Sequence, residues 1–133
     1  MSNFTTPLIV TPLADGRHWV VIRKFEYHVG SKYSNNVVRV PPDFVTDFAS
    51  SPWFAWWAIP SWGKYGKAAI IHDFLYQHKY MNREVSEIVS QIPVTRKRAD
   101  DIFKEAMIVL GVKKWRIFLM YWGVRLFGWL AWR

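Results

Sequence analysis

The chain has 133 residues, of which 51% are hydrophobic and 18% aromatic, and its nine Trp, 18 basic and 10 acidic residues give a net charge of +8. This composition excludes an intrinsically disordered chain and is typical of one compact domain with a sizeable core. There is no Cys, which excludes disulfide bonds, thiolate metal sites and a Cys nucleophile, so calcium or another oxygen-preferring ion fits better than structural zinc.

Residues 5–45 are predicted to be rich in β structure. From Trp19 to Val29 apolar and polar residues alternate, which is the period of a strand with one buried face. Asp15-Gly16 is a turn signal, so residues 8–13 are expected to pair with that strand as a hairpin. A shorter strand is expected over residues 37–40, where a Pro pair ends it.

Residues 46–133 are predicted to be mostly helical. We expect helices over about residues 65–80, 83–91, 95–111 and 114–130. Thr95 is a candidate N-cap for the third of these helices, and Gly111 a candidate stop. The predicted fold class is therefore α+β, with a small N-terminal antiparallel sheet followed by a helical bundle, in a single domain over residues 1–133.

A histidine and an aspartate lie side by side in an apolar helical stretch. At about 100° per residue, His72 falls in the middle of the face that carries Ala68 and Leu75, while Asp73 is turned away from its centre. A lone histidine on such a face is usually a core residue satisfied by a hydrogen bond. Two polar groups in one apolar helix both need partners, which favours a functional site. Together they can supply a general base and a metal ligand.

The helix predicted over residues 95–111 offers a carboxylate partner. Its apolar stripe consists of Ala99, Ile102, Phe103, Ala106, Met107 and Leu110. Asp100 lies at the edge of that stripe and can reach inward, whereas Asp101 is expected to point into solvent. A carboxylate bonded to one nitrogen of His72 would fix the tautomer and leave the other nitrogen as a base. The alternative is an ordinary first-turn acid near the positive end of the helix dipole.

Asp47 is a third candidate, in a loop-like stretch with Ser50 and Ser51. Its carboxylate could bind a cation together with main-chain carbonyls and Asp73. The alternative is a turn or capping role, which Asp and Ser often have. A Ser nucleophile is not favoured, because no nucleophile-elbow glycines flank these residues.

Aromatic residues are concentrated before the His72 helix and at the C-terminal end. The residues of the first group, which could line an apolar cleft, contact lipid or pack in the core, are Trp53, Trp56, Trp57 and Trp62. The second group lies within residues 115–132, whose only charges are Arg116 and Arg125. This stretch is short for a membrane-spanning helix, and it is apolar on nearly all sides. We expect it to dock on the core or on another protein, with membrane contact as the second interpretation.

Charge and the N-terminal sequence limit the partners. The basic residues are spread along the chain and form no nucleic-acid-binding motif, so nucleic acid is not favoured as a partner. Anionic lipid or another envelope component fits the charge better. Residues 1–6 are polar and begin no signal peptide, so none is expected.

Five stretches of the sequence together resemble an uncharacterised family encoded by tailed phages and prophages, the domain of unknown function 1353. These stretches are residues 40–52 (VPPDFVTDFASSP), 63–69 (GKYGKAA), 72–76 (HDFLY), 98–103 (RADDIF) and 124–129 (VRLFGW). The resemblance implies an accessory protein found in the host cytoplasm during assembly or in the virion, with other phage structural proteins as partners. It brings no established activity.

Two of the predicted helices also resemble secreted phospholipases A2, especially the small bacterial type. Residues 72–76 are similar to their His-Asp-Phe-x-Tyr catalytic helix, and residues 98–107 to the helix that carries their supporting Asp. By this resemblance His72 would activate a water, Asp73 would bind calcium and Asp100 would orient His72. The disulfides and the glycine-rich calcium loop of those enzymes have no counterpart in this sequence.

Two functional hypotheses follow. In the first, the protein is a calcium-dependent hydrolase of lipid or another envelope ester, with His72 and Asp100 as catalytic residues and Asp73 and Asp47 as metal ligands. In the second, it is a non-enzymatic virion or tail-assembly component with a structural His-Asp cluster and an aromatic interaction surface. A peptidoglycan hydrolase is a third option, which the basic charge alone supports.

Overall fold

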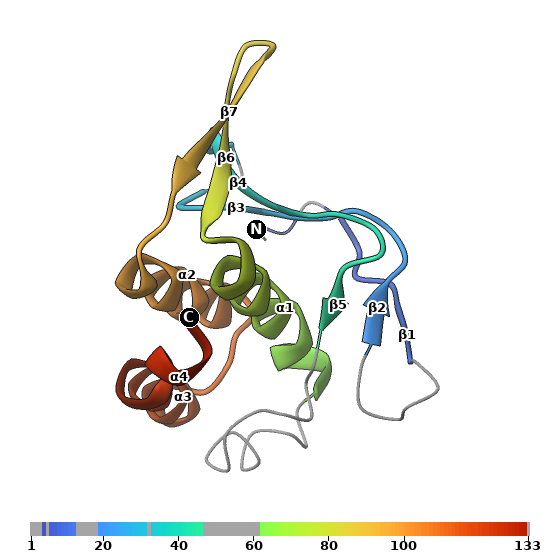
Figure 1. The fold of residues 1–133 in the computed structure, drawn as a ribbon. Coiled ribbons are helices and arrows are strands. Elements are labelled where there is room, and N and C mark those ends of the chain that lie inside the picture. Colours follow the sequence, from blue (N-terminus) through green and yellow to red (C-terminus); the bar gives the residue numbers. More distant parts are fainter. Residues whose placement is uncertain (1–3, 5, 13–18, 32, 47–61, 133) are drawn as a thin grey trace. The chain divides into compact units, whose positions relative to one another are not determined.

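A computed structural model of the chain describes residues 4, 6–12, 19–31, 33–46 and 62–132. The fold class is α+β, as predicted. The chain divides into two compact units, the first formed by Met1–Ser50 and Tyr80–Pro93 and the second by Ser51–Lys79 and Val94–Arg133. The named strands belong to the first unit and the named helices to the second (Figure 1).

The first unit contains two antiparallel sheets. One has the strand order β1-β2-β5 and consists of β1 (Val10–Pro12), β2 (Trp19–Val21) and β5 (Val45–Thr46). The other has the order β3-β4-β6-β7 and consists of β3 (Phe25–His28), β4 (Asn36–Val40), β6 (Tyr80–Val85) and β7 (Ile88–Pro93). The strand predicted over residues 37–40 is confirmed as β4.

The alternation that begins at Trp19 is divided between these sheets. β2 pairs with β1, which confirms the predicted hairpin pairing, while β3 pairs with β4. Phe25 and Tyr27 are inaccessible to solvent, and the ring of Phe4 packs on both, at centroid distances of 5.5 and 4.6 Å. The turn predicted at Asp15-Gly16 lies outside the described residues.

The helix predicted over residues 83–91 is wrong, because this segment belongs to the hairpin of β6 and β7. Val85 pairs with Ile88 around a two-residue turn, and Ser86 in that turn has a φ of 56°, a left-handed conformation that suits such tight loops. β6 also pairs with β4. Hydrogen bonds to strands on both sides thus hold β6 extended and override the helical spacing of the apolar residues.

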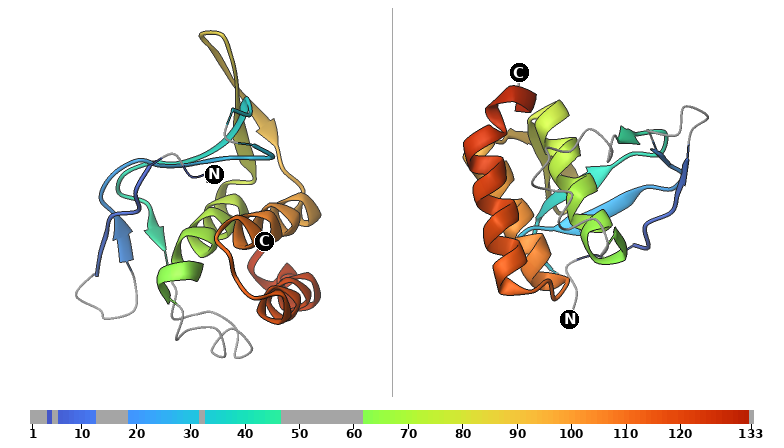
Figure 2. Two further views of the ribbon diagram at one scale, coloured as in Figure 1. Left: turned by 180° about the vertical axis from the view of Figure 1, so that it is seen from behind. Right: turned by 90° about the horizontal axis from the view of Figure 1, so that it is seen from below.

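In the described part of the chain the second unit contains α1 (Trp62–His78), α2 (Arg96–Val109), α3 (Lys114–Phe127) and α4 (Trp129–Trp132). These helices confirm the three other predicted ones, with α3 and α4 in place of one helix over residues 114–130. α1 packs against α2 and α2 against α3, while α4 returns to α1 (Figures 1 and 2). No helix among the described residues is long and apolar enough to cross a membrane.

Capping interactions at both ends of α2 determine where the helix begins and ends. The Oγ1 of Thr95 accepts a hydrogen bond from the backbone amide of Arg98 at 3.1 Å, which confirms the predicted N-cap. At the other end Gly111 has a φ of 77°, and the Val112 amide donates to the Met107 carbonyl at 3.1 Å. Glycine adopts this left-handed conformation without steric cost, so the predicted helix stop is also confirmed.

The connection between α1 and α2 is closed by a backbone hydrogen bond. The Val94 amide donates to the Lys79 carbonyl at 2.9 Å, next to the first register pair of β6 and β7, Tyr80 with Pro93. The hairpin therefore leaves the helical unit and returns to it at adjacent positions.

Candidate functional site

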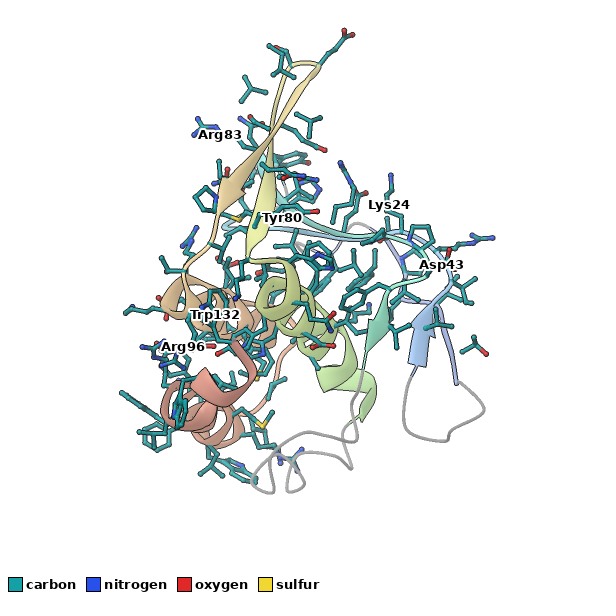
Figure 3. All side chains as sticks on the ribbon, in the orientation of Figure 1. Lys24, Asp43, Tyr80, Arg83, Arg96 and Trp132 are labelled. Atoms are coloured by element: carbon teal, nitrogen blue, oxygen red, sulfur yellow. The ribbon has the colours of Figure 1, made fainter. Side chains whose placement is uncertain are left out.

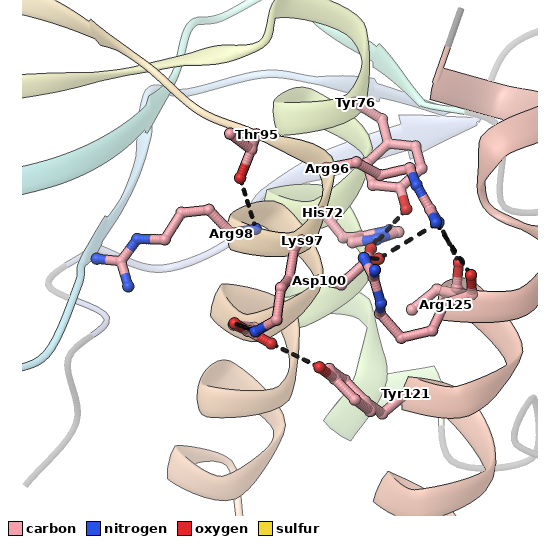
Figure 4. Close-up of polar contacts among 11 residues, drawn as sticks. His72, Tyr76, Thr95, Arg96, Lys97, Arg98, Asp100, Tyr121 and Arg125 are labelled. Atoms are coloured by element: carbon pink, nitrogen blue, oxygen red, sulfur yellow. Dashed lines mark hydrogen bonds and ion pairs between the residues drawn. The ribbon is translucent and has the colours of Figure 1, made fainter.

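α1 and α2 bring together the two residues that interrupt their apolar faces. The Nε2 of His72 lies 2.8 Å from the Oδ1 of Asp100 (Figure 4). An ionised carboxylate can only accept a hydrogen bond, so Nε2 carries the proton that is donated. In the neutral imidazole the other nitrogen, Nδ1, is then unprotonated and can take up a proton.

Packing holds the His72 ring in place. Its centroid lies 4.1 Å from that of Tyr76 on the same helix and 4.5 Å from that of Phe103 on α2. The His72 side chain retains 14% of its exposure, whereas Asp100 is fully buried. The carboxylate is thus sealed in the protein while the imidazole keeps some access to solvent, which suits a base that exchanges protons with a bound water.

Tyr76 is a further member of the cluster, to which the sequence pattern assigned no polar role. It follows His72 by one helical turn, and its hydroxyl donates to the same Oδ1 of Asp100 at 2.5 Å. Burial raises the pKa of Tyr76, and the hydrogen bond to Asp100 raises it further, so the phenol stays protonated and remains a donor. The i, i+4 spacing of His72 and Tyr76, which places both side chains on one face of the helix, was the sequence signal for this role.

Two arginines hold the other carboxylate oxygen. The Nη1 of Arg125, from α3, donates to Oδ2 of Asp100 at 2.9 Å, and the Nη1 of Arg96 lies 3.6 Å from the same oxygen. Arg96 also donates to the carbonyls of Val124 and Arg125 at 3.0 and 3.1 Å. Asp100 of α2 is therefore linked to α1 through hydrogen bonds from His72 and Tyr76, and to α3 through a hydrogen bond from Arg125.

These contacts keep Asp100 ionised. Burial alone would raise the pKa of Asp100, but the hydrogen bonds from His72, Tyr76 and Arg125 together hold it below the ordinary value. A buried charge is tolerated only when it is paired and its lone pairs are satisfied, and both conditions hold for this residue.

Asp101 is only partly exposed, although the helical pattern places it in solvent. Its side chain keeps 37% exposure, pairs with Lys97 at 2.8 Å and accepts a hydrogen bond from the Tyr121 hydroxyl at 2.6 Å. Burial would raise the pKa of Asp101, but Lys97 and Tyr121 hold it below the ordinary value. The periodicity of α2 alone cannot reveal Tyr121, because this residue comes from the neighbouring α3.

The predicted metal ligands are placed only in part. Asp73 is half-buried next to His72 and accepts a hydrogen bond from the Gln77 side chain at 3.3 Å. Asp47 lies outside the described residues, as do its Ser neighbours and the Trp53–Trp57 cluster. Within the described residues no three His, Asp or Glu side chains are grouped so that they could hold a metal ion. Calcium takes six to eight oxygen ligands, so Asp73 supplies only part of a site.

The chain matches the model of a protein family over most of its length. Residues 19–124 match the model of a family described as a protein of unknown function (DUF1353). The matched range runs from β2 to α3 and includes His72, Tyr76, Arg96 and Asp100. Comparisons with curated proteins and with solved structures found no match.

Proposed function

The chain belongs to the DUF1353 family of proteins of unknown function, and we propose that it is a phage or prophage accessory protein that hydrolyses an ester of lipid or of another envelope component. The observation that carries the proposed activity is the hydrogen bond between His72 and the buried carboxylate of Asp100. His72 is the proposed general base and Asp100 its positioning partner. The five sequence stretches quoted above support the phage assignment.

The proposed chemistry is water attack on an ester carbonyl. As the water oxygen bonds to the carbonyl carbon, Nδ1 of His72 takes its proton, and the ionised Asp100 stabilises the resulting imidazolium through Nε2. Collapse of the tetrahedral intermediate breaks the bond to the alkoxide, which receives the proton from His72. The products are a carboxylic acid and an alcohol, and the imidazole returns to its neutral form.

Calcium is part of the proposal through Asp73 and Asp47. A bound calcium ion would polarise the ester carbonyl and stabilise negative charge on its oxygen. The resemblance of residues 72–76 to the phospholipase A2 helix supports this assignment. Asp73 precedes Gln77 by one turn of α1 and lies one residue from the proposed base.

A second candidate function is supported by the arginines. Arg125 binds Asp100, and Arg96 binds carbonyls near the end of α3, so the cluster joins helices as well as orienting His72. A virion or tail-assembly component without enzymatic activity would need only this structural role. Its aromatic C-terminal segment would then be an interaction surface.

The experiment that separates these candidates is hydrolysis of mixed phosphatidylglycerol and phosphatidylcholine vesicles, with calcium or with chelator. Wild type should release fatty acid only when calcium is present. The rate of release by His72→Ala should be lower by about a hundredfold or more. His78→Ala is the matched control, because His78 is an exposed histidine at the end of the same helix. If wild type releases no fatty acid and His72→Ala mainly loses stability, the structural candidate is supported instead.

A further inference from the structure

The outward side of α3 carries a continuous apolar face, which we call the α3 aromatic face. At about 100° per residue, five of its residues fall within an arc of about 100° on α3, and a Trp of α4 continues it. Each of the six side chains is between 44% and 63% exposed. They are Trp115, Phe118, Leu119, Trp122, Leu126 and Trp129.

The α3 aromatic face does not hold the helix in place. The neighbouring side of α3 does so, through buried Ile117 and through the bonds of Tyr121 and Arg125 to the two aspartates of α2. In Figure 3 side chains extend from α3 on the side away from α2. This arrangement explains why the sequence is apolar on nearly all sides of α3: one side packs on α2 and the other is exposed.

Positive charge borders the α3 aromatic face. Lys113 and Lys114 are exposed at the beginning of the helix, and the Arg116 guanidinium lies 5.1 Å from the centre of the Trp115 ring. After Glu105 the sequence contains five Lys or Arg and no Asp or Glu. A negatively charged partner would therefore be attracted to α3, whose own residues include no Asp or Glu.

These properties are those of a helix that lies in a membrane interface. Half of the residues in the face are Trp, whose amphipathic ring favours the headgroup level of a bilayer. Aliphatic and Phe side chains add apolar area to be buried, and Lys attracts anionic headgroups. A protein partner would be expected to mix apolar contacts with charges of both signs, and the segment offers one sign only.

We propose that the α3 aromatic face docks on the surface of an anionic phospholipid bilayer, with α3 parallel to the membrane plane. The proposal stands on this face alone and does not require hydrolysis by His72. It adds a binding surface to the proposed function, and it would apply equally to a protein without enzymatic activity.

The test is co-sedimentation of the wild-type protein with vesicles in chelator, which separates binding from the proposed calcium-dependent hydrolysis. Binding should be stronger to vesicles of phosphatidylglycerol and phosphatidylcholine than to phosphatidylcholine alone, and it should weaken as salt is raised. Replacing Trp122 and Leu126 by Ser should lower the partition coefficient by at least about tenfold. Replacing Lys113 and Lys114 by Gln should lower it by about fivefold for each lysine.

Matched variants control for general effects. Ile88→Ser with Val89→Ser removes exposed apolar side chains from the β6–β7 hairpin, and Arg23→Gln with Lys24→Gln removes two exposed charges from the first unit. Both should bind vesicles as the parent protein does.

Two results of the co-sedimentation would overturn the proposal. One is that the Trp122 and Leu126 variant binds as strongly as the parent protein, and the other is that the parent protein does not bind. Light scattering measures self-association. If the parent protein self-associates and the Trp122 and Leu126 variant does not, the face binds a second copy of the chain and the proposal is also overturned.

Discussion

Gly128 lies directly against the hydroxyl of Tyr76. A Cβ atom at position 128 would collide with that oxygen and with the Val124 carbonyl, and it would approach the Arg96 guanidinium. Gly128 also ends α3, since its amide donates to the Val124 carbonyl at 2.8 Å. The absence of a side chain at this position therefore allows the end of α3 to approach the residues that hold Asp100.

Gly128→Ala should disturb the cluster as well as lower stability. The extra methyl must displace Tyr76 or α3, which we expect to cost about 1–3 kcal/mol in the free energy of unfolding. Urea unfolding measures the loss, and the NMR signals of the His72 ring report on the cluster. Gly111→Ala is the comparison, because a Cβ there meets nothing within 4 Å and only the positive φ is strained. It should be destabilising while leaving the His72 signals in place.

Asp100→Asn should affect both hydrolysis and stability. The amide cannot stabilise an imidazolium as a carboxylate does, so ester hydrolysis should fall by about a hundredfold or more. Loss of the charge opposite Arg125 should lower the free energy of unfolding by about 3–5 kcal/mol, the usual cost of breaking a buried pair. Asp101→Asn, at the neighbouring half-exposed residue, should cost no more than about 1 kcal/mol and keep activity. Equal effects of Asp100→Asn and Asp101→Asn on hydrolysis and stability would argue against Asp100 as the positioning partner of His72.

Tyr76→Phe removes one donor from the Oδ1 of Asp100 and leaves the ring. We expect a loss of about 1–3 kcal/mol in the free energy of unfolding, because the buried oxygen loses a charge-assisted hydrogen bond. Hydrolysis should fall less than with Asp100→Asn, since His72 keeps its own bond to the carboxylate. Tyr121→Phe, which removes the bond to half-exposed Asp101, should be less destabilising in the same urea titration.

Stability should decrease in acid partly through Asp100. Because its folded pKa lies below the ordinary value, ionised Asp100 contributes stability above the unfolded pKa of about 3.9, and this contribution is lost as pH falls through the lower folded pKa. The difference in unfolding free energy between wild type and Asp100→Asn should therefore shrink below about pH 4. A constant difference from pH 7 to pH 3 would show that the carboxylate charge does not contribute.

The core of the site was predictable because two polar residues break apolar patterns. His72 and Asp100 each interrupt a helix whose other inward positions are apolar, and a buried polar group needs a partner. Their pairing across 28 residues follows from that requirement. Their catalytic roles, and those of Asp73 and Asp47 as metal ligands, stay predictions.

The rest of the cluster depends on contacts between helices, which spacing within one helix does not encode. Arg125 fits an exposed basic position as well as a buried one until α3 is placed against α2. Tyr76 fits an apolar face whether or not its hydroxyl is bonded. The strands over residues 83–91 were missed for a related reason, because pairing with β4 decides their conformation and β4 lies more than 40 residues earlier in the chain.

The hydrogen bond between Val94 and Lys79 gives the β6–β7 hairpin the character of an insertion. The helical chain is interrupted there by Tyr80–Pro93, yet the two ends of the interruption are already joined by a backbone bond of 2.9 Å. A tight turn in place of Tyr80–Pro93 could connect Lys79 to Val94, with α1 and α2 still side by side. We therefore expect the length of the hairpin to have little effect on the distance between His72 and Asp100.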